Sequence, residues 1–178
     1  MQIFSNPSIS AQPLLTYELA HIATEIIDLA CLSHPELEPL YRMQRTIGCR
    51  VNELFEPWRW QLYQENFVII QPQKGNNQRL LSLREMQIES VADFEILKHD
   101  MEHYSKRQYE RAFAHGVRQI GLYQVFEDGF AHPSTHMLRH LKIKEMQDRG
   151  NTLEEIQTYI GEKCVDNLYY YLNSQFYI

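Results

Sequence analysis

The sequence has few of the features that secreted or membrane proteins need. Its 178 residues include only three cysteines, seven glycines and seven prolines. No apolar run approaches the roughly 18 residues of a membrane-spanning helix, and the first residues lack the charged start and apolar core of a signal peptide. The cysteines are odd in number and far apart, which favours free thiols in a reducing compartment. We therefore expect a cytoplasmic protein with no membrane partner.

An excess of positive charge is also missing. Lysine and arginine number 17 against 23 aspartates and glutamates, so the formal net charge is −6. Duplex-binding proteins are usually basic, because neutralising phosphates and releasing counterions carries most of their affinity. Any binding to DNA must therefore use local basic clusters. The sequence offers one at residues 98–118 and a second at residues 139–149.

The patterning predicts one folded domain. A hydrophobic share of 44% is ordinary for a globular core, and we divide the chain into an N-terminal arm (1–15) and a domain (16–178). Apolar residues recur at helical spacing over most of the domain. The expected helices lie at residues 16–31 (capped by Thr16), 34–47, 50–54, 90–115 as one long helix, from 136 onward, 152–160 and 165–172.

A β-rich segment interrupts this helical pattern. Residues 66–71 and 79–83 are β-rich runs on either side of a turn that contains Lys74 and Gly75, which predicts a β-hairpin. Residues 121–133 are expected to form a loop. The predicted fold class is therefore α+β, mainly α-helical with a small antiparallel β-sheet.

Residues suited to phosphate chemistry gather late in the chain. A helix starting near His136 would present His136, Arg139 and His140 over about one turn, because residues three and four apart share a face. Three consecutive tyrosines (169–171) follow on the last helix. An arginine, a histidine and a tyrosine on neighbouring helices suit phosphoryl transfer through a tyrosine nucleophile.

Two earlier segments offer complementary groups. Arg50 has a planar fork that donates bidentately to phosphate oxygens, and Glu53, one turn later, is placed to orient it. Lys74 would sit at the tip of the hairpin as a mobile ammonium. The alternatives are a surface Arg–Glu pair on a helix and a solvated lysine in a turn.

In order and spacing, these segments resemble the tyrosine recombinase (phage integrase) family. The segment Thr46-Ile-Gly-Cys-Arg50-Val-Asn-Glu-Leu matches the family motif Thr-Gly-x-Arg-x-x-Glu-Leu. The Lys74 hairpin matches Gly-Lys-Gly-x-x-x-Arg-x-x-x-Leu, and His136-x-x-Arg139 matches His-x-x-Arg. Lys74 follows Arg50 by 24 residues (74 − 50), and Tyr171 follows Glu162 by nine (171 − 162), both as in the family. The likeness covers residues 46–171 and implies a catalytic domain without the usual N-terminal clamp domain.

The resemblance implies strand exchange on double-stranded DNA without a metal ion or any cofactor. Tyr171 would attack a phosphate to form a 3′-phosphotyrosine link and release a 5′-hydroxyl. Arg50 and Arg139 would stabilise the transition state, Lys74 would be the general acid, and His136 would assist proton transfer. The implied partners are further copies of the chain, in a tetrameric synapse, and an accessory DNA-binding protein in place of the clamp domain. A nucleoid-associated location follows from this function.

Several basic residues outside this set are predicted to contact DNA. They are Lys98, Lys106, Arg107, Arg111, His140, Lys142 and Lys144.

Glu162 departs from the family pattern. The segment Ile160-Gly161-Glu162 matches the family's Leu-Gly-His, in which the last residue donates a hydrogen bond to the phosphate. An ionised carboxylate only accepts hydrogen bonds. Three explanations stay open: Glu162 is protonated beside the phosphate, it pairs with Lys163 or Arg139, or the protein is a catalytically weak member.

Two other hypotheses compete with a recombinase. His99 and His103 have a spacing that suits a metal ion, but the glutamate of the zinc-protease motif is absent, and we predict no metal site. The stronger alternative is a DNA-binding accessory member of the family that no longer cuts. Glu162, the acidic balance and the missing clamp domain favour it.

Overall fold

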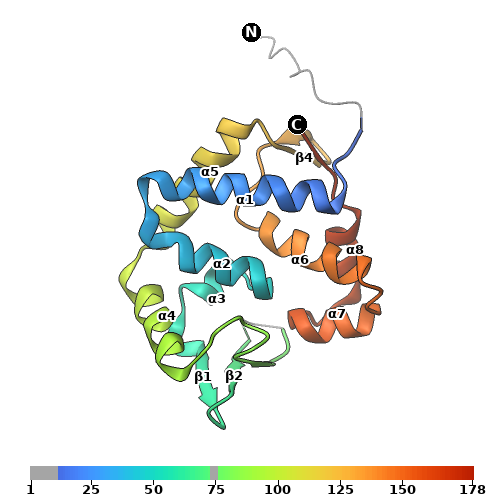
Figure 1. Cartoon of the computed structure of the whole chain (residues 1–178). Helices are drawn as coiled ribbons and strands as arrows, with labels where there is room; N and C mark the ends of the chain where they lie inside the picture. The colour runs from blue at the N-terminus through green and yellow to red at the C-terminus, as the bar shows by residue number, and fades with distance from the viewer. Residues whose placement is uncertain (1–11, 73–75) are drawn as a thin grey trace.

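The computed structural model describes residues 12–72 and 76–178 (Figure 1). Within them, short 3₁₀ turns, η1 (Pro35–Leu37) and η2 (Pro57–Arg59), precede α2 and β1, and no helix is long and apolar enough to cross a membrane. The α-helices are α1 (Thr16–Ser33), α2 (Glu38–Ile47), α3 (Val51–Leu54), α4 (Val91–His103), α5 (Lys106–Ile120), α6 (Met137–Asp148), α7 (Leu153–Ile160) and α8 (Val165–Asn173).

Two small antiparallel sheets accompany the helices in the described residues. The first has the order β1-β2-β3, from β1 (Trp60–Tyr63), β2 (Phe67–Ile70) and β3 (Arg79–Ser82). The second has the order β5-β4-β6, from β4 (Tyr123–Phe126), β5 (Gly129–Ala131) and β6 (Phe176–Tyr177). The predicted fold class and the hairpin of β2 and β3 are confirmed, whereas β1 and β6 were not predicted.

Three predictions about single elements were wrong. Residues 90–115 form two helices, because the chain breaks at Tyr104 and the Ser105 hydroxyl caps α5 by accepting from Gln108 N at 3.1 Å. Residues 121–133 hold a hairpin, in which β4 pairs with β5, and the distant strand β6 pairs with β4 as well. Thr16 begins α1 without capping it, and the Glu18 carboxylate accepts from the preceding backbone N–H, at Leu15.

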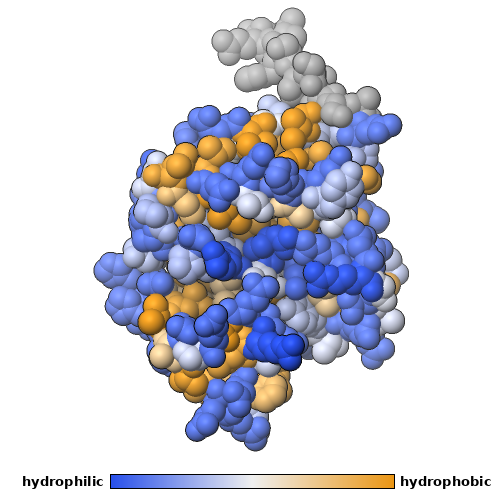
Figure 2. Space-filling model, viewed as in Figure 1, coloured by the Kyte–Doolittle hydropathy of each residue, from blue (hydrophilic) through white to orange (hydrophobic). Residues whose placement is uncertain are grey.

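The core has a large and a small part. The large part lies among α1, α2, α5, α6 and the first sheet, with Tyr41 stacked on Tyr109 at 4.1 Å between ring centroids. The small part lies among α6, α7 and α8. Hydrophilic residues cover the middle of the face seen in Figure 2, with hydrophobic ones towards its upper end and lower left. Helix α6 contributes to both cores, so its side chains lie at the boundary between them.

Helix α5 packs along α1 (Figure 1), and Gly116 sets how closely the two approach. A Cβ atom at this position would lie 2.6 Å from the backbone oxygen of Ile26. Real Cβ atoms do not approach a backbone atom so closely, so this glycine is required by packing.

We expect Gly116→Ala to destabilise the protein. Alanine is intrinsically better than glycine in a helix by about 1 kcal/mol, but here it must push α5 away from α1. Overpacking of this kind typically costs about 1–3 kcal/mol, so the free energy of unfolding should fall in urea denaturation. Gln119→Ala, at an exposed position of the same helix, is the control. A Gly116→Ala protein that is more stable than wild type would contradict the packing.

Candidate active site

Arg50 stands at the start of α3, immediately after the turn that ends α2. Gly48 makes this turn in the left-handed conformation (φ 62°). The Glu53 carboxylate accepts from Arg50 N at 2.9 Å and lies 3.7 Å from its guanidinium. The backbone oxygen of Glu53 accepts from Trp60 Nε1 at 2.8 Å, which ties α3 to β1. Glu53 therefore fixes the backbone from which the Arg50 side chain leaves.

Arg139 is completely buried on α6. Its Nη1 donates to Gly48 O at 2.7 Å, and its Nη2 donates to Ile160 O at 3.3 Å. These carbonyls lie at the C-terminal ends of α2 and α7, where the helix dipole favours a cation. The guanidinium thus joins two helix ends to α6, and its Nε has no partner among the described residues.

Glu162 lies between the two arginines and is 2% exposed. Its Oε2 is paired with Arg50 Nη2 and accepts from Arg139 Nη2 at 3.3 Å. Its Oε1 accepts from Asn167 Nδ2 at 2.9 Å. The Asn76 amide, in the orientation that satisfies both neighbours, donates to the same oxygen at 3.2 Å and accepts from Arg50 Nη1 at 3.1 Å. Both carboxylate oxygens are therefore fully bonded.

Tyr171 is the tyrosine that faces this cluster. His136 Nε2 lies 3.0 Å from its hydroxyl, and the Arg139 guanidinium lies 5.4 Å from its ring centroid. The Tyr171 side chain is 6% exposed, whereas Tyr169 and Tyr170 are about half exposed, at 48% and 55%. Of the three consecutive phenols, only Tyr171 has the surroundings of a nucleophile next to cationic groups.

Two histidines on one side of the cluster, the partly buried His136 and the buried His140, are held neutral. Burial lowers the pKa of His136 to about 4, with a further contribution from Arg139 and Arg50. Burial also lowers the pKa of His140 to about 3, helped by His136. His140 is packed against the rings of Tyr171 and Phe176.

The sequence did not reveal all members of the cluster. Arg79 is 2% exposed and donates to Glu53 Oε2 at 2.9 Å and to Ile47 O at 3.2 Å. It was visible as the arginine of the hairpin motif, but no role was assigned to it. Asn76 and Asn167 had no recognisable signal, because their role depends on a contact with Glu162 across the fold.

Gly161 allows this convergence. It is left-handed (φ 72°), and a Cβ there would lie 2.8 Å from both Arg79 Cγ and Asn77 O. Its carbonyl accepts from Asn77 N at 3.0 Å. The end of α7 therefore touches the hairpin backbone, which places Glu162 beside Arg50.

Lys142 and Lys144 do not join the cluster, and Lys74 lies outside the described residues. Lys144 donates to Leu172 O at 2.8 Å and Lys142 lies over the Tyr159 ring, so both have structural contacts, and the buried His140 has no exposed surface for DNA. The described residues contain no group of three or more histidine, cysteine or acidic side chains arranged to hold a metal ion.

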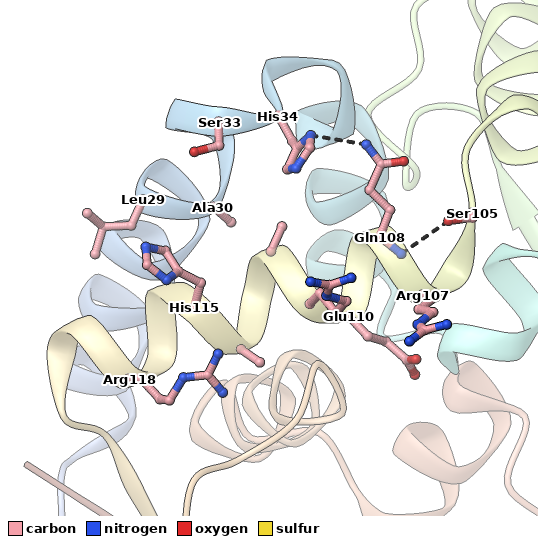
Figure 3. A pocket seen from close by; sticks show the side chains of 13 residues that line it. Leu29, Ala30, Ser33, His34, Ser105, Arg107, Gln108, Glu110, His115 and Arg118 are labelled. Carbon is pink, nitrogen blue, oxygen red and sulfur yellow. Dashed lines mark hydrogen bonds between the residues drawn. The ribbon is translucent and has the colours of Figure 1, made fainter.

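A second basic region lies on α5. Arg107, Arg111 and Arg118 line an open pocket of about 890 Å³ between α5 and the end of α1. Figure 3 shows His34 facing Gln108 across it, with a hydrogen bond of 3.0 Å. The arginines here are exposed, which suits a surface that contacts a polyanion and differs from the buried arginines of the cluster.

Lys98, on α4, and Lys106, at the start of α5, have partners of their own. Lys98 Nζ lies 5.8 Å from the Phe94 ring centroid, and Lys106 Nζ bonds Asn52 and lies 3.7 Å from Glu110.

Searches of protein families and of curated proteins found no match to this sequence. Solved structures are similar. XerA recombinase is 18% identical, with 86% of this chain and 58% of that chain covered and a TM-score of 0.59. A lambda integrase dimer bound to a COC′ core site is 17% identical, with 91% and 48% covered and a TM-score of 0.62. XerH site-specific recombinase bound to palindromic difH substrate, in a post-cleavage complex, is 16% identical, with 91% and 50% covered and a TM-score of 0.56.

This chain thus spans roughly half the length of each of these proteins. At such identities the likeness establishes the fold, which is that of the tyrosine recombinase catalytic domain.

The neutral histidines predict a loss of stability in mild acid. Histidine in an unfolded chain has a pKa of about 6.5. Below that pH, the two histidines bind protons in the unfolded state but stay neutral in the folded state, which favours unfolding. Stability should be full above about pH 6.5 and fall as the pH drops towards 4. At pH 5, each of these two histidines should lower the free energy of unfolding by about 2 kcal/mol. Urea unfolding at pH 7.5 and pH 5 measures this, and His140→Gln should reduce the difference. The control His99→Gln, at an exposed site, should leave this pH difference in stability unchanged. If His140→Gln also leaves it unchanged, the explanation is wrong.

Proposed function

We propose that the protein is a site-specific recombinase that cuts and rejoins DNA through Tyr171. One observation carries the proposal: the Tyr171 hydroxyl lies 3.0 Å from His136 Nε2, and the Arg139 guanidinium lies 5.4 Å from the Tyr171 ring and shares Glu162 with Arg50. A phenol has a pKa of about 10 in water and is a poor nucleophile. It needs a nearby base and a cationic site for the phosphate.

The proposed reaction is a single phosphoryl transfer to Tyr171. Tyr171 Oη forms a bond to the DNA phosphorus while the bond from phosphorus to the 5′ oxygen breaks. The product is a 3′-phosphotyrosine and a free 5′-hydroxyl, whose proton comes from Lys74. The phosphodiester energy is conserved in the new bond, so a 5′-hydroxyl of another strand reverses the step without ATP.

His136 receives the proton of Tyr171 in this scheme. Its low pKa, caused first by burial, keeps the ring neutral at pH 7, and a neutral ring with its proton on Nδ1 leaves Nε2 free to accept. Arg50 and Arg139 would stabilise the charge on the non-bridging oxygens. Preorganised donors of this kind typically contribute about 10²–10³-fold each.

The substrate is proposed by analogy with the similar structures. The lambda integrase dimer is bound to a core site, and XerH is bound to a palindromic substrate in a post-cleavage complex. We propose double-stranded DNA as the partner here, bound in part through Arg107 and Arg111, with several copies of the chain assembling on two duplexes. We also propose an accessory DNA-binding protein as a partner.

A second candidate function is DNA binding without cleavage. It is favoured by one observation, the Glu162 carboxylate that already fills the space between the two arginines. In such a protein the cluster would be a structural ion network, and the exposed arginines of α5 would carry the binding.

A covalent-trapping assay separates the two functions. With a nicked suicide substrate, wild type should accumulate a protein–DNA adduct, and Tyr171→Phe should form none while still binding DNA. Tyr170→Phe and Tyr169→Phe are matched controls that should keep the adduct, since both side chains are half exposed. An adduct that survives in Tyr171→Phe would assign the nucleophile elsewhere, and no adduct in any protein would favour binding without cleavage.

A further inference from the structure

The most unusual feature of the site is an acidic side chain where an anion would bind. Four donors converge on Glu162: the two guanidiniums and the amides of Asn76 and Asn167. A carboxylate and a phosphate present similar pairs of oxygen acceptors to guanidinium. Glu162 therefore already uses the donors that a DNA phosphate would need. We call the space between the guanidiniums of Arg50 and Arg139 the anion position.

Access to the anion position also depends on Glu162. The Arg139 side chain is fully buried, while that of Arg50 is 18% exposed. A phosphate arriving from solvent meets Arg50 first and reaches Arg139 Nη2 only where the carboxylate now lies. The Arg139 Nη1 atom is already bonded to Gly48 O, and the unpartnered Nε is buried, so Nη2 is the atom through which a phosphate would contact this guanidinium.

The charges of the cluster agree with this competition. Arg50, Arg79 and Arg139 supply three positive charges, and Glu53 and Glu162 supply two negative ones, which leaves +1 (3 − 2). With Glu162 in place, a phosphate would therefore come next to this carboxylate, and the cluster has only one net positive charge to stabilise it. Like charges at such distances repel strongly when they are removed from water.

We propose that Glu162 is an internal anion that occupies the anion position and closes it to phosphate, so that a phosphate binds there only by displacing this carboxylate. The inference rests on the proposed function in so far as it takes Arg50 and Arg139 as the phosphate site. Displacement requires rotation of the Glu162 side chain, because the backbone of Gly161 is held against Arg79 and Asn77. The residues that follow, 163–167, are exposed and leave room beside the turn.

Titration of the protein with inorganic phosphate tests the proposal directly. The signals of the guanidinium groups of Arg50 and Arg139 in nuclear magnetic resonance report whether phosphate enters. Wild type is compared with Glu162→Gln, which keeps the size and removes the charge. The control is Glu154→Gln, the same change at an exposed position of α7.

We expect phosphate to shift the Arg139 signals in Glu162→Gln. Its affinity for wild type should be about 10- to 100-fold weaker, which is the range for the loss of one hydrogen bond to a charged group. Glu154→Gln should match wild type. Wild type that binds phosphate at Arg139 as tightly as Glu162→Gln would overturn the proposal. If Glu162→Gln does not fold, Glu162→His is the second variant without the carboxylate, and wild type is compared with it in the same way.

The outcomes separate this proposal from the proposed function. If folded Glu162→Gln and Glu162→His bind no phosphate, the anion position is not a phosphate site, and both proposals fail. If Glu162→Gln binds phosphate but forms no adduct with DNA, the inference stands and cleavage fails. If the protein does cleave, both variants should form the covalent adduct about tenfold faster or more, as expected when an opposing charge is removed.

Discussion

The ion network around Arg139 is the interaction on which the rest of this structure depends. Its guanidinium reaches the carbonyl ends of α2 and α7 and the carboxylate of Glu162 from a position with no exposure to water. A buried charge without such partners would cost several kcal/mol, so the partners and the arginine must be kept together. The same contacts bring the end of α7, and with it Glu162, against the turn that carries Arg50.

This arrangement links stability and chemistry in the same residues. Arg79 and Glu53 form a second buried pair beside the first, and Glu53 also holds the backbone of Arg50. Removing one partner of a buried pair typically costs about 3–5 kcal/mol, because the other charge is left uncompensated. A fold that needs its arginines neutralised has therefore placed a carboxylate in the space a phosphate would fill. Glu162 stabilises the free protein and opposes the proposed substrate at once.

Local sequence patterns predicted the parts of the fold that local forces decide. The left-handed Gly48 after α2, the Thr152 cap of α7 and the hairpin of β2 and β3 follow from turn and capping chemistry. The break at Ser105 was missed because the apolar spacing continues across it. Strand β6 was missed because its partner β4 lies about 50 residues away, which no local pattern contains, and the local hairpin of β4 and β5 was missed in a segment that was expected to be a loop.

In the site too, some features follow from sequence spacing and others depend on contacts between distant residues. Motif spacing brought Arg50, His136, Arg139, Glu162 and Tyr171 into one hypothesis, and the structure does place their side chains together. It did not predict how Glu162 pairs: of the alternatives considered, pairing with Arg139 is the one observed, and Arg50 joins it. The roles of Asn76 and Asn167 depend on side-chain directions in three dimensions, which spacing along the chain does not determine.

A crystal structure of the protein with duplex DNA would show most directly whether a DNA phosphate displaces Glu162. We expect a backbone phosphate within hydrogen-bond distance of both Arg50 and Arg139, with the Tyr171 hydroxyl facing its phosphorus. The Glu162 carboxylate should be turned out of the anion position. DNA bound across α5 or elsewhere, with Glu162 still between the two arginines and no phosphate near Tyr171, would contradict it.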